Sequence, residues 1–341
     1  MKIVGVKPIY GGSLTVMEYA LNALSQLGHE VIPLDFSRFL PLFRHIKHTG
    51  DGQAARALKE QITREIIEKL HDYTPDVLFG IAQAPIFPQV LHFCKKHRIY
   101  TVYWFVEDFL RFGYWKRIAG LYDLFLIIQK SPLVELIKKL GGRPLYLPLA
   151  ADPSVHRPIS LSEEEKTEYG SLVSFVGAGY PNRIALFEKL ELENFKIWGS
   201  DWVLPPESNL WKALQRNGKR IAVSEYVKIF NASLVNLNLH SSINPNEMGT
   251  GDFVNPRTFE IASCRAFQIV DHRTLLGELF KEQEEIIVCR TIDQIKQAIR
   301  QALHEPEWTR ELAEKAYRRT LKEHTYLHRM IELVRILEEK A

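Results

Sequence analysis

Cysteine is scarce in this sequence: only Cys94, Cys264 and Cys289 occur, far apart and never as a C-x-x-C pair. That number and spacing argue against a disulfide framework and against a structural zinc site. No stretch approaches about 18 uncharged apolar residues, which excludes a membrane-spanning helix. The chain begins MKIVGVKPIYGGS, where a short apolar run before a glycine pair predicts a first strand rather than a signal peptide. We therefore expect a soluble, cytoplasmic protein.

Charge of one sign is not concentrated anywhere in the chain. There are 44 Lys and Arg against 41 Asp and Glu, a net charge of +3. Proteins that bind nucleic acid usually concentrate their basic residues, and no block of about five like charges occurs here. No nucleic-acid partner is expected.

Several catalytic motifs are also missing. The dinucleotide fingerprint G-x-G-x-x-G is absent, which argues against NAD or FAD, and there is no P-loop and no G-x-S-x-G elbow. No D-x-D triplet occurs either, and no third ligand follows a histidine pair at a metal-binding spacing. We expect neither a cofactor nor a metal site.

What the sequence does contain is the pattern of an α/β protein. Its 341 residues are 46% apolar and 25% charged, which predicts a packed globule of two domains. Short β-rich runs alternate with helical patterns in both halves, which is typical of doubly wound parallel sheets. The proline-rich stretch LYLPLAADPSVHRP separates the halves, and helical patterns close the chain.

The segment GDFVNPRTFEIASCRAFQIV, residues 251–270, carries the most informative polar residues. If Pro256 opens a helix, the N–H groups near Asn255 and Thr258 point out of its start and favour a phosphate. Arg257 beside them can add a bidentate charge. Glu260, one turn further, can accept hydrogen bonds from two ribose hydroxyls. The alternative is a surface pair of Arg257 and Glu260, three residues apart on one helix face.

The run RTFEIASCRA, residues 257–266, resembles the donor-site helix of GT-B glycosyltransferases, in particular the spore-maturation (CgeB-like) family. The donor domain of that family is similar to the donor domains of glycosyltransferase families 1 and 4. LPLAADPSVHRP, VSFVGAGYPNRIALFEKL and HTYLHRMIELVRIL resemble the family's interdomain stretch, nucleotide-binding opening and terminal helix. The sequence departs from the family at Arg265, where glycine is usual, and at His156, where phenylalanine is common. Neither position is expected to touch the sugar.

The resemblance implies a GT-B fold: two Rossmann-like domains facing across a cleft, with the C-terminal helix crossing back to the first. The expected acceptor-side domain is 1–150, the nucleotide-sugar (donor) domain 151–305 and the returning helices 306–341. The implied activity is metal-independent transfer of a sugar, a hexosyltransferase-type reaction, from a nucleotide diphosphate sugar to a hydroxyl of a glycan, protein or small molecule. An E-x7-E-like pair, here Asp252 and Glu260, leans towards retention. A nucleotide-sugar-binding module without catalysis and a nucleotide-sugar epimerase remain open as alternatives.

The resemblance also gives roles to single residues. Glu260 is expected to hold the ribose, while Arg257 and the amides near Asn255 stabilise the charge on the leaving diphosphate. Arg183 is a second pyrophosphate candidate, or else a solvated residue in a first helical turn. Asp252 is expected in the same donor site.

Other candidate donor contacts lie in loops that follow strands. They are Gly177, Gly179, Trp198 and Gly199 in the second half, and Gly11, Gly12 and Ser13 in the first. The glycines suit tight turns that bring backbone close to a ligand, although a plain turn explains them equally. Trp198 can stack on a base, or belong to the core.

Three further residues are candidates for catalysis. Glu107 and Asp108 follow a strand, where a carboxylate can act as general base on the acceptor hydroxyl. Asp108 can instead cap the next helix. His240 ends an apolar run and can face the sugar or the leaving phosphate, or else be a satisfied strand-end histidine.

Overall fold

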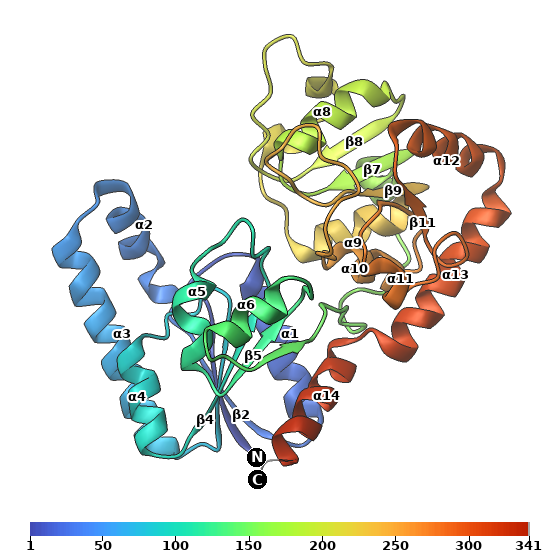
Figure 1. Ribbon diagram of the computed structural model, residues 1–341. Coiled ribbons are helices and arrows are strands. Elements are labelled where there is room, and N and C mark those ends of the chain that lie inside the picture. Colours follow the sequence, from blue (N-terminus) through green and yellow to red (C-terminus); the bar gives the residue numbers. More distant parts are fainter. Residues whose placement is uncertain (340–341) are drawn as a thin grey trace. The chain divides into compact units, whose positions relative to one another are not determined.

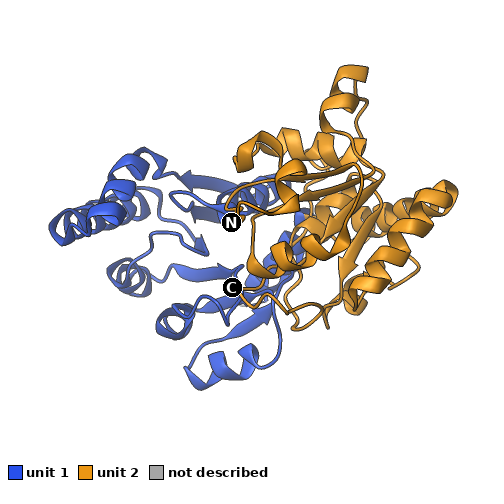
Figure 2. Cartoon of the chain, turned by 90° about the horizontal axis from the view of Figure 1, so that it is seen from above, with its two compact units in different colours: residues 1–148, 326–341 blue, residues 149–325 orange. Residues whose placement is uncertain are grey.

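The computed structural model describes residues 1–339, and the chain divides into two compact units. Unit 1 contains Met1–Pro148 and the C-terminal segment that begins at Tyr326, and unit 2 contains Leu149–Thr325. Figure 2 colours unit 1 blue and unit 2 orange. Each unit is a parallel sheet with helices on its faces, as expected of a GT-B fold.

The sheet of unit 1 has six parallel strands in the order β2-β1-β3-β4-β5-β6. Their bounds are β1 Lys2–Val6, β2 Glu30–Leu34, β3 Val77–Ile81, β4 Tyr100–Phe105, β5 Leu124–Ile127 and β6 Pro144–Tyr146. The helices are α1 Gly12–Gln26, α2 Leu40–Thr49, α3 Gly52–Tyr73, α4 Pro88–Lys96, α5 Trp115–Ile118, α6 Leu133–Lys139 and α14 Tyr326–Glu338, with 3-10 turns η1 Ser37–Phe39 and η2 Ala119–Leu121.

The core of unit 1 forms because its central strands are apolar on both faces. All five residues of β3, VLFGI, are buried, as parallel strands covered by helices require. Leu58, Ile62 and Ile66, at helical spacing on α3, pack into the same apolar cluster. The second and third strands, β2 and β3, lie on opposite sides of β1. The sheet therefore has its topological switch point between β1 and β3, where ligands of such sheets usually bind.

The sheet of unit 2 has five parallel strands in the order β11-β10-β9-β7-β8. Their bounds are β7 Val173–Val176, β8 Phe195–Trp198, β9 Val235–Asn238, β10 Gln268–Asp271 and β11 Ile287–Cys289. The helices are α7 Glu163–Tyr169, α8 Pro181–Leu190, α9 Val223–Ala232, α10 Arg257–Ser263, α11 Leu276–Leu279, α12 Ile292–His304 and α13 Pro306–Glu323, with η3 Asn209–Lys212 and η4 Gln215–Gly218. The switch point lies between β7 and β9, beside the loops that carry most of the donor-site candidates.

The closing helices differ from the prediction that all of residues 306–341 return to the first domain. Helix α13 belongs to unit 2, because Leu312 and Ala313 pack into the apolar cluster of that unit's sheet. Only α14 belongs to unit 1, where it packs along α1, and Figure 1 shows the two helices side by side. Tyr326, the first residue of α14, is buried with its ring 5.3 Å from that of Tyr19.

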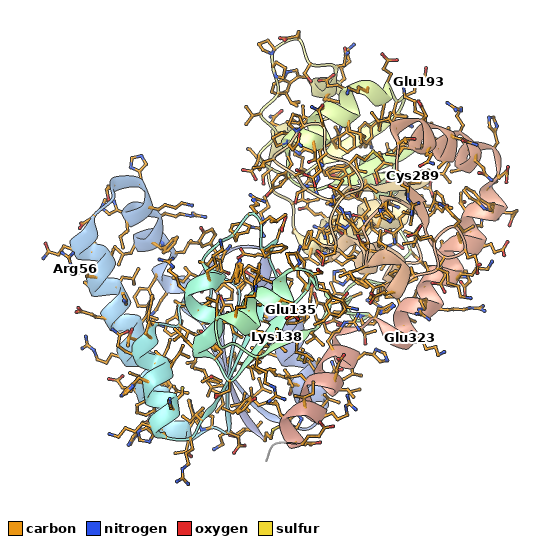
Figure 3. The ribbon with its side chains drawn as sticks, in the orientation of Figure 1. Arg56, Glu135, Lys138, Glu193, Cys289 and Glu323 are labelled. Carbon is orange, nitrogen blue, oxygen red and sulfur yellow. The ribbon has the colours of Figure 1, made fainter. Side chains whose placement is uncertain are left out.

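The three cysteines are free and buried, and Cys289 lies at the end of β11 inside unit 2 (Figure 3). Arg265, where the family usually has glycine, adopts φ 56°, the left-handed conformation that glycine favours. Its Nε lies 2.5 Å from Glu314 on α13. Within residues 1–339, no helix has the length and hydrophobicity needed to cross a membrane.

Candidate functional site

The candidate donor site of unit 2 is built around the buried carboxylate of Glu260 on α10. Glu260 is 5% exposed and forms an ion pair with Arg257, one turn earlier on the same helix. The Arg257 guanidinium lies 4.0 Å from the centre of the Tyr226 ring on α9. The predicted pair of Arg257 and Glu260 therefore exists, but the carboxylate lies inside the unit and not on a solvated helix face.

His156, from the stretch after β6, completes this cluster. The N–H of Asp152 donates to His156 Nδ1, so the neutral ring carries its proton on Nε2. That nitrogen lies 3.0 Å from the Tyr226 hydroxyl and 3.7 Å from Glu260 Oε1. His156, which is not expected to touch the sugar, thus lies beside the carboxylate that is expected to hold the ribose.

The electrostatics of the cluster keep the histidine neutral and the arginine charged. Burial lowers the pKa of His156, although the Glu260 charge acts in the opposite direction. Burial also acts to lower the pKa of Arg257, but the Glu260 charge and the Tyr226 hydroxyl outweigh it and raise that pKa. One full positive charge therefore balances the Glu260 carboxylate.

The start of α10 is already hydrogen-bonded within the protein. The Asn255 N–H donates to His240 Nε2 at 3.1 Å, and the Thr258 N–H donates to the Asn255 side-chain oxygen at 3.2 Å. Thr258 is fully buried. The amides of Asn255 and Thr258, which were predicted to hold a pyrophosphate, are thus already used by the protein. The first joins the helix start to His240 after β9, and the second bonds within the helix start.

His240 lies beneath this helix start and is fully buried. Since Nε2 accepts from Asn255, Nδ1 carries the proton and donates to Asp271 Oδ1 at 2.7 Å. Burial alone acts to raise the pKa of Asp271, but His240 and Arg273 hold it well below its usual value. Burial lowers the pKa of His240. The geometry is that of a satisfied strand-end histidine, and it does not support a catalytic role for His240.

Arg183 on α8 is likewise committed to the protein. Its Nε donates to the Leu239 carbonyl at 3.0 Å and its Nη1 to the Ala178 carbonyl at 2.9 Å. Burial lowers its pKa to about 10. Arg183 therefore connects the loop after β7 to the end of β9. It is not the solvated residue of one alternative, and its side chain is bonded to the protein rather than free for the pyrophosphate of the other.

The glycines after β7 and β8 are required by the close approach of two loops. A Cβ on Gly179 would lie 2.6 Å from the Asp201 carbonyl oxygen, and one on Gly199 would lie 2.3 Å from the Gly177 carbonyl oxygen. A Cβ on Gly177 would meet the Phe175 ring at 2.8 Å. These contacts are with the protein itself, which is the plain-turn alternative.

Trp198 belongs to the core, at 2% exposure, and its ring lies 5.8 Å from that of Tyr169. It does not offer a face to a nucleotide base. Asp252 is half-buried in the loop before α10. In that loop Glu247 accepts from the Thr250 hydroxyl at 2.6 Å and lies 3.8 Å from Arg273.

In unit 1, the loop after β1 opens α1 at the switch point of the sheet. Gly11 has φ 108°, and a Cβ there would lie 3.3 Å from Gln83 Oε1 in the loop after β3. A Cβ on Gly12 would meet nothing within 4 Å. The Ser13 hydroxyl donates to the Ala82 carbonyl at 3.0 Å. Ser13 thus has a structural partner, whereas Gly12 faces open space.

The two carboxylates after β4 have different surroundings. Asp108 accepts from the Leu110 N–H at 3.0 Å and so closes a turn, close to the capping alternative. Glu107 accepts from the Tyr114 hydroxyl at 2.6 Å and from the Gln83 amide. Of the two, Glu107 faces the loop after β3, at the edge of the sheet where the Gly11 loop lies.

The structure therefore brings His156, Arg257 and Glu260 together in unit 2, and Gly11, Gln83 and Glu107 together in unit 1. Sequence reasoning missed Tyr226, Gln83 and the polar side chains under α10. One signal was present: β9 continues as V-N-L-N-L-H, and alternate residues of a strand share one face. Asn236, Asn238 and His240 all make buried side-chain hydrogen bonds there. Among residues 1–339, no group of three or more His, Cys, Asp or Glu is arranged to hold a metal ion.

Comparison with known proteins places the chain among glycosyltransferases. Residues 183–335 match a family model described as "Glycosyl transferase-like". The chain is 24% identical over 217 residues to the spore protein CgeB of Bacillus subtilis (strain 168), covering 61% of this chain and 67% of that protein. That match confirms the resemblance drawn from the donor-site helix and its neighbours.

Solved structures share the fold over the whole chain. HepE of Anabaena, determined with UDP and glucose, superposes with a TM-score of 0.69 at 11% identity, covering 99% of this chain and 100% of that one. Sucrose-phosphate synthase of Thermosynechococcus elongatus gives a TM-score of 0.67 at 10% identity, covering 99% and 98%. The shared architecture shows a GT-B fold, and the match to the family model over residues 183–335 together with the curated relative supports a CgeB-like glycosyltransferase.

Proposed function

We propose that this protein transfers a sugar from a nucleoside diphosphate sugar to a hydroxyl acceptor, with retention at the anomeric carbon and without a metal ion. Unit 2 binds the donor and unit 1 supplies the acceptor side. UDP is the first nucleotide to test, because a structural neighbour, HepE, was determined with UDP and with UDP-glucose.

The observation that carries the proposal is the buried Glu260 carboxylate, held by Arg257 and bordered by His156 and Tyr226. A carboxylate that is already fixed and charge-balanced can accept two ribose hydroxyls without first losing its geometry. It lies on α10, which follows the central strand β9 and falls within the residues matched by the family model. Donor recognition by Glu260 is thus supported by position and by surroundings.

Arg257 is the residue of this cluster best suited to the diphosphate. A guanidinium has five N–H donors, and Arg257 uses Nη1 for Glu260. It can keep that ion pair and still donate to a donor phosphate. Positive charge fixed at the leaving group stabilises the charge that develops there, which is the role that a metal ion fills in other transferases.

The reaction proposed here is a substitution at the anomeric carbon in which, for retention, the acceptor oxygen bonds on the same face that the diphosphate leaves. The acceptor oxygen bonds to the anomeric carbon, the bond from that carbon to the diphosphate oxygen breaks, and the nucleoside diphosphate leaves with the electron pair. The proton of the acceptor hydroxyl passes to a base, for which Glu107 is the candidate. The Asp252 and Glu260 pair, with its E-x7-E-like spacing, supports retention. A trehalose-6-phosphate synthase structure studied for transfer with retention shares the fold at a TM-score of 0.64.

The test is to incubate the purified protein with UDP-, GDP- and ADP-glucose in EDTA, and to follow nucleotide release and the anomeric proton by NMR. We expect one donor to be consumed in EDTA, with an α-linked product or α-glucose from an α-linked donor. A β product would overturn retention, and activity that appears only with added Mg²⁺ or Mn²⁺ would overturn metal independence. Interconversion of the nucleotide sugar without release of nucleotide would indicate an epimerase.

A further inference from the structure

Unit 1 contains an apolar pocket of about 470 Å³ that the proposed function has not yet used. Its walls include Tyr10 after β1, Phe43 and Ile46 on α2, Ile62 on α3, and Ala84 and Phe87 after β3. The pocket therefore lies at the carboxyl ends of β1 and β3, which flank the switch point of the sheet. Its volume is in the range of pockets that bind small molecules.

The helix that borders this pocket is incompletely packed. None of the ten residues of α2 is buried, although its sequence, LPLFRHIKHT, places Phe43 and Ile46 on one face. Both side chains line the pocket, and the Phe43 ring lies 5.4 Å from that of Tyr10. An amphipathic helix normally buries its apolar face. Here that face meets an open cavity, so an apolar ligand would bury surface that the protein alone leaves accessible.

The polar end of the pocket is connected to the candidate base. Gln83 lines the pocket, and its side-chain amide donates to Glu107 Oε1. Gly11, which precedes α1, lies close to Gln83, since a Cβ there would be 3.3 Å from Gln83 Oε1. A molecule whose apolar part fills the pocket would thus present its nearest polar atoms to Gln83, which is hydrogen-bonded to Glu107, or to Lys59, the charged residue of the lining.

We propose that this pocket binds an apolar aglycone, the alkyl or aryl part of the acceptor, and so holds the acceptor hydroxyl beside Glu107. The identification of the ligand as an acceptor rests on the proposed function, but binding in the pocket does not require a donor. It makes the acceptor an amphipathic alcohol rather than a free sugar.

The test is calorimetric binding, without donor, of n-alkyl β-D-glucosides from methyl to octyl, each below its critical micelle concentration, with phenyl β-D-glucoside as the aryl probe. We expect affinity to rise about fourfold per added methylene until the pocket is full, which corresponds to burial of one CH₂ group at a time. Tight binding of the phenyl compound with a flat alkyl series would assign the pocket to aryl groups. Equal, weak binding of every compound would overturn the proposal.

A matched pair of variants locates the binding. Ala55 on α3 lines the pocket, whereas Ala57, two residues along the same helix, is exposed and does not. Exposed Arg56 between them points outward from α3 in Figure 3. Ala55→Phe should weaken octyl glucoside binding at least tenfold, and Ala57→Phe should leave it unchanged. If Ala55→Phe fails to fold, Ile46→Gln, which makes the wall polar, serves as the second variant. Wild-type affinity in a folded pocket variant would overturn the proposal.

The UDP affinity of the same samples separates this inference from the proposed function. Both pocket variants should bind UDP as the wild type does, because no pocket residue belongs to unit 2. Alkyl binding without UDP binding would contradict the proposed function and leave the pocket assignment standing. UDP binding without alkyl glucoside binding would contradict the pocket assignment and leave the proposed function standing.

Discussion

Two buried histidines make the stability of unit 2 depend on pH. Burial lowers the pKa of both His156 and His240 below the ordinary value of 6.5. At pH values near and below 6.5, the unfolded chain therefore binds protons on these histidines that the folded chain does not bind. The stability that depends on the neutral histidines is fully present above that pH and is lost as the pH falls. We expect the free energy of unfolding to fall by up to about 1 kcal/mol per histidine between pH 6.5 and 5.5.

Urea unfolding at pH 7.5, 6.5 and 5.5 measures this dependence. His156→Phe restores the residue that is common in the family. It should reduce by one the number of protons taken up on unfolding, and so reduce the slope of the free energy of unfolding with pH. A variant of the exposed His48, His48→Gln, should keep the wild-type slope. Stability that is constant from pH 7.5 to 5.5 would show that folding does not lower the pKa of either histidine.

Two glycines that looked alike in the sequence have different physical reasons. A Cβ on Gly179 would collide with backbone atoms of Asp201 and Trp202 at 2.6 Å, whereas a Cβ on Gly12 would meet nothing within 4 Å. Gly179→Ala should therefore cost about 1–3 kcal/mol, the range for overpacking. Gly12→Ala, in the first turn of α1, should be neutral or stabilising by up to about 1 kcal/mol.

Thermal unfolding of the two variants tests this contrast, and nucleotide-release kinetics adds the functional reading. If Gly12→Ala is stable but slow, the glycine is needed for the approach of a ligand. If Gly179→Ala proves as stable as the wild type, the close packing of the loops after β7 and β8 does not require glycine at that position.

At the scale of elements, β9 and α10 are joined by side chains rather than by apolar packing alone. Asn238 donates to Thr258 Oγ1 at 3.0 Å and to Gln268 Oε1 at 3.1 Å, and accepts from the Asn255 amide at 2.8 Å. These groups are buried, so each must be satisfied inside the protein. The strand thus fixes the start of the helix that carries Glu260.

Asn238→Leu should destabilise the protein by about 2–4 kcal/mol, because it leaves several buried polar groups without partners. The same change at the exposed Asn209 should stay within about 0.5 kcal/mol. Urea unfolding of the two variants decides this. Equal stability of Asn238→Leu and wild type would mean that water or rearrangement replaces the lost hydrogen bonds.

The elements were largely predictable because their signals are local. Gly28 after α1, Pro256 before α10 and the apolar runs of β3 and β9 each mark an element in sequence. What local signals do not contain is which partner a polar residue finds. Arg183 and His240 were candidates for ligand contact, with a solvated residue and a satisfied strand-end histidine as the respective alternatives. In the structure they bond to Leu239, Ala178 and Asp271, which the fold brings to them.

At the scale of the whole chain, the closing helices are divided between the units. The pattern predicted that all of the helical tail over 306–341 returns to the first domain. It did not predict that α13 would stay with unit 2 while α14 completes unit 1, because both segments are amphipathic and no local signal indicates which face each one covers. The pairing of Arg257 with Glu260 was predicted more closely, since the two residues are three apart on one helix. Its buried surroundings, His156 and Tyr226, come from segments more than 30 residues away along the chain.

The proposed function depends most on the binding of the donor nucleotide by Glu260 in unit 2. Calorimetric titration of UDP in EDTA into wild type, Glu260→Ala and Glu311→Ala tests it most directly, since Glu311 is an exposed glutamate on α13 of the same unit. Loss of hydrogen bonds to a charged group costs about 1.5–3 kcal/mol, so Glu260→Ala should bind UDP about 10- to 150-fold more weakly, and Glu311→Ala like wild type. Wild-type UDP affinity in a folded Glu260→Ala protein would contradict the account.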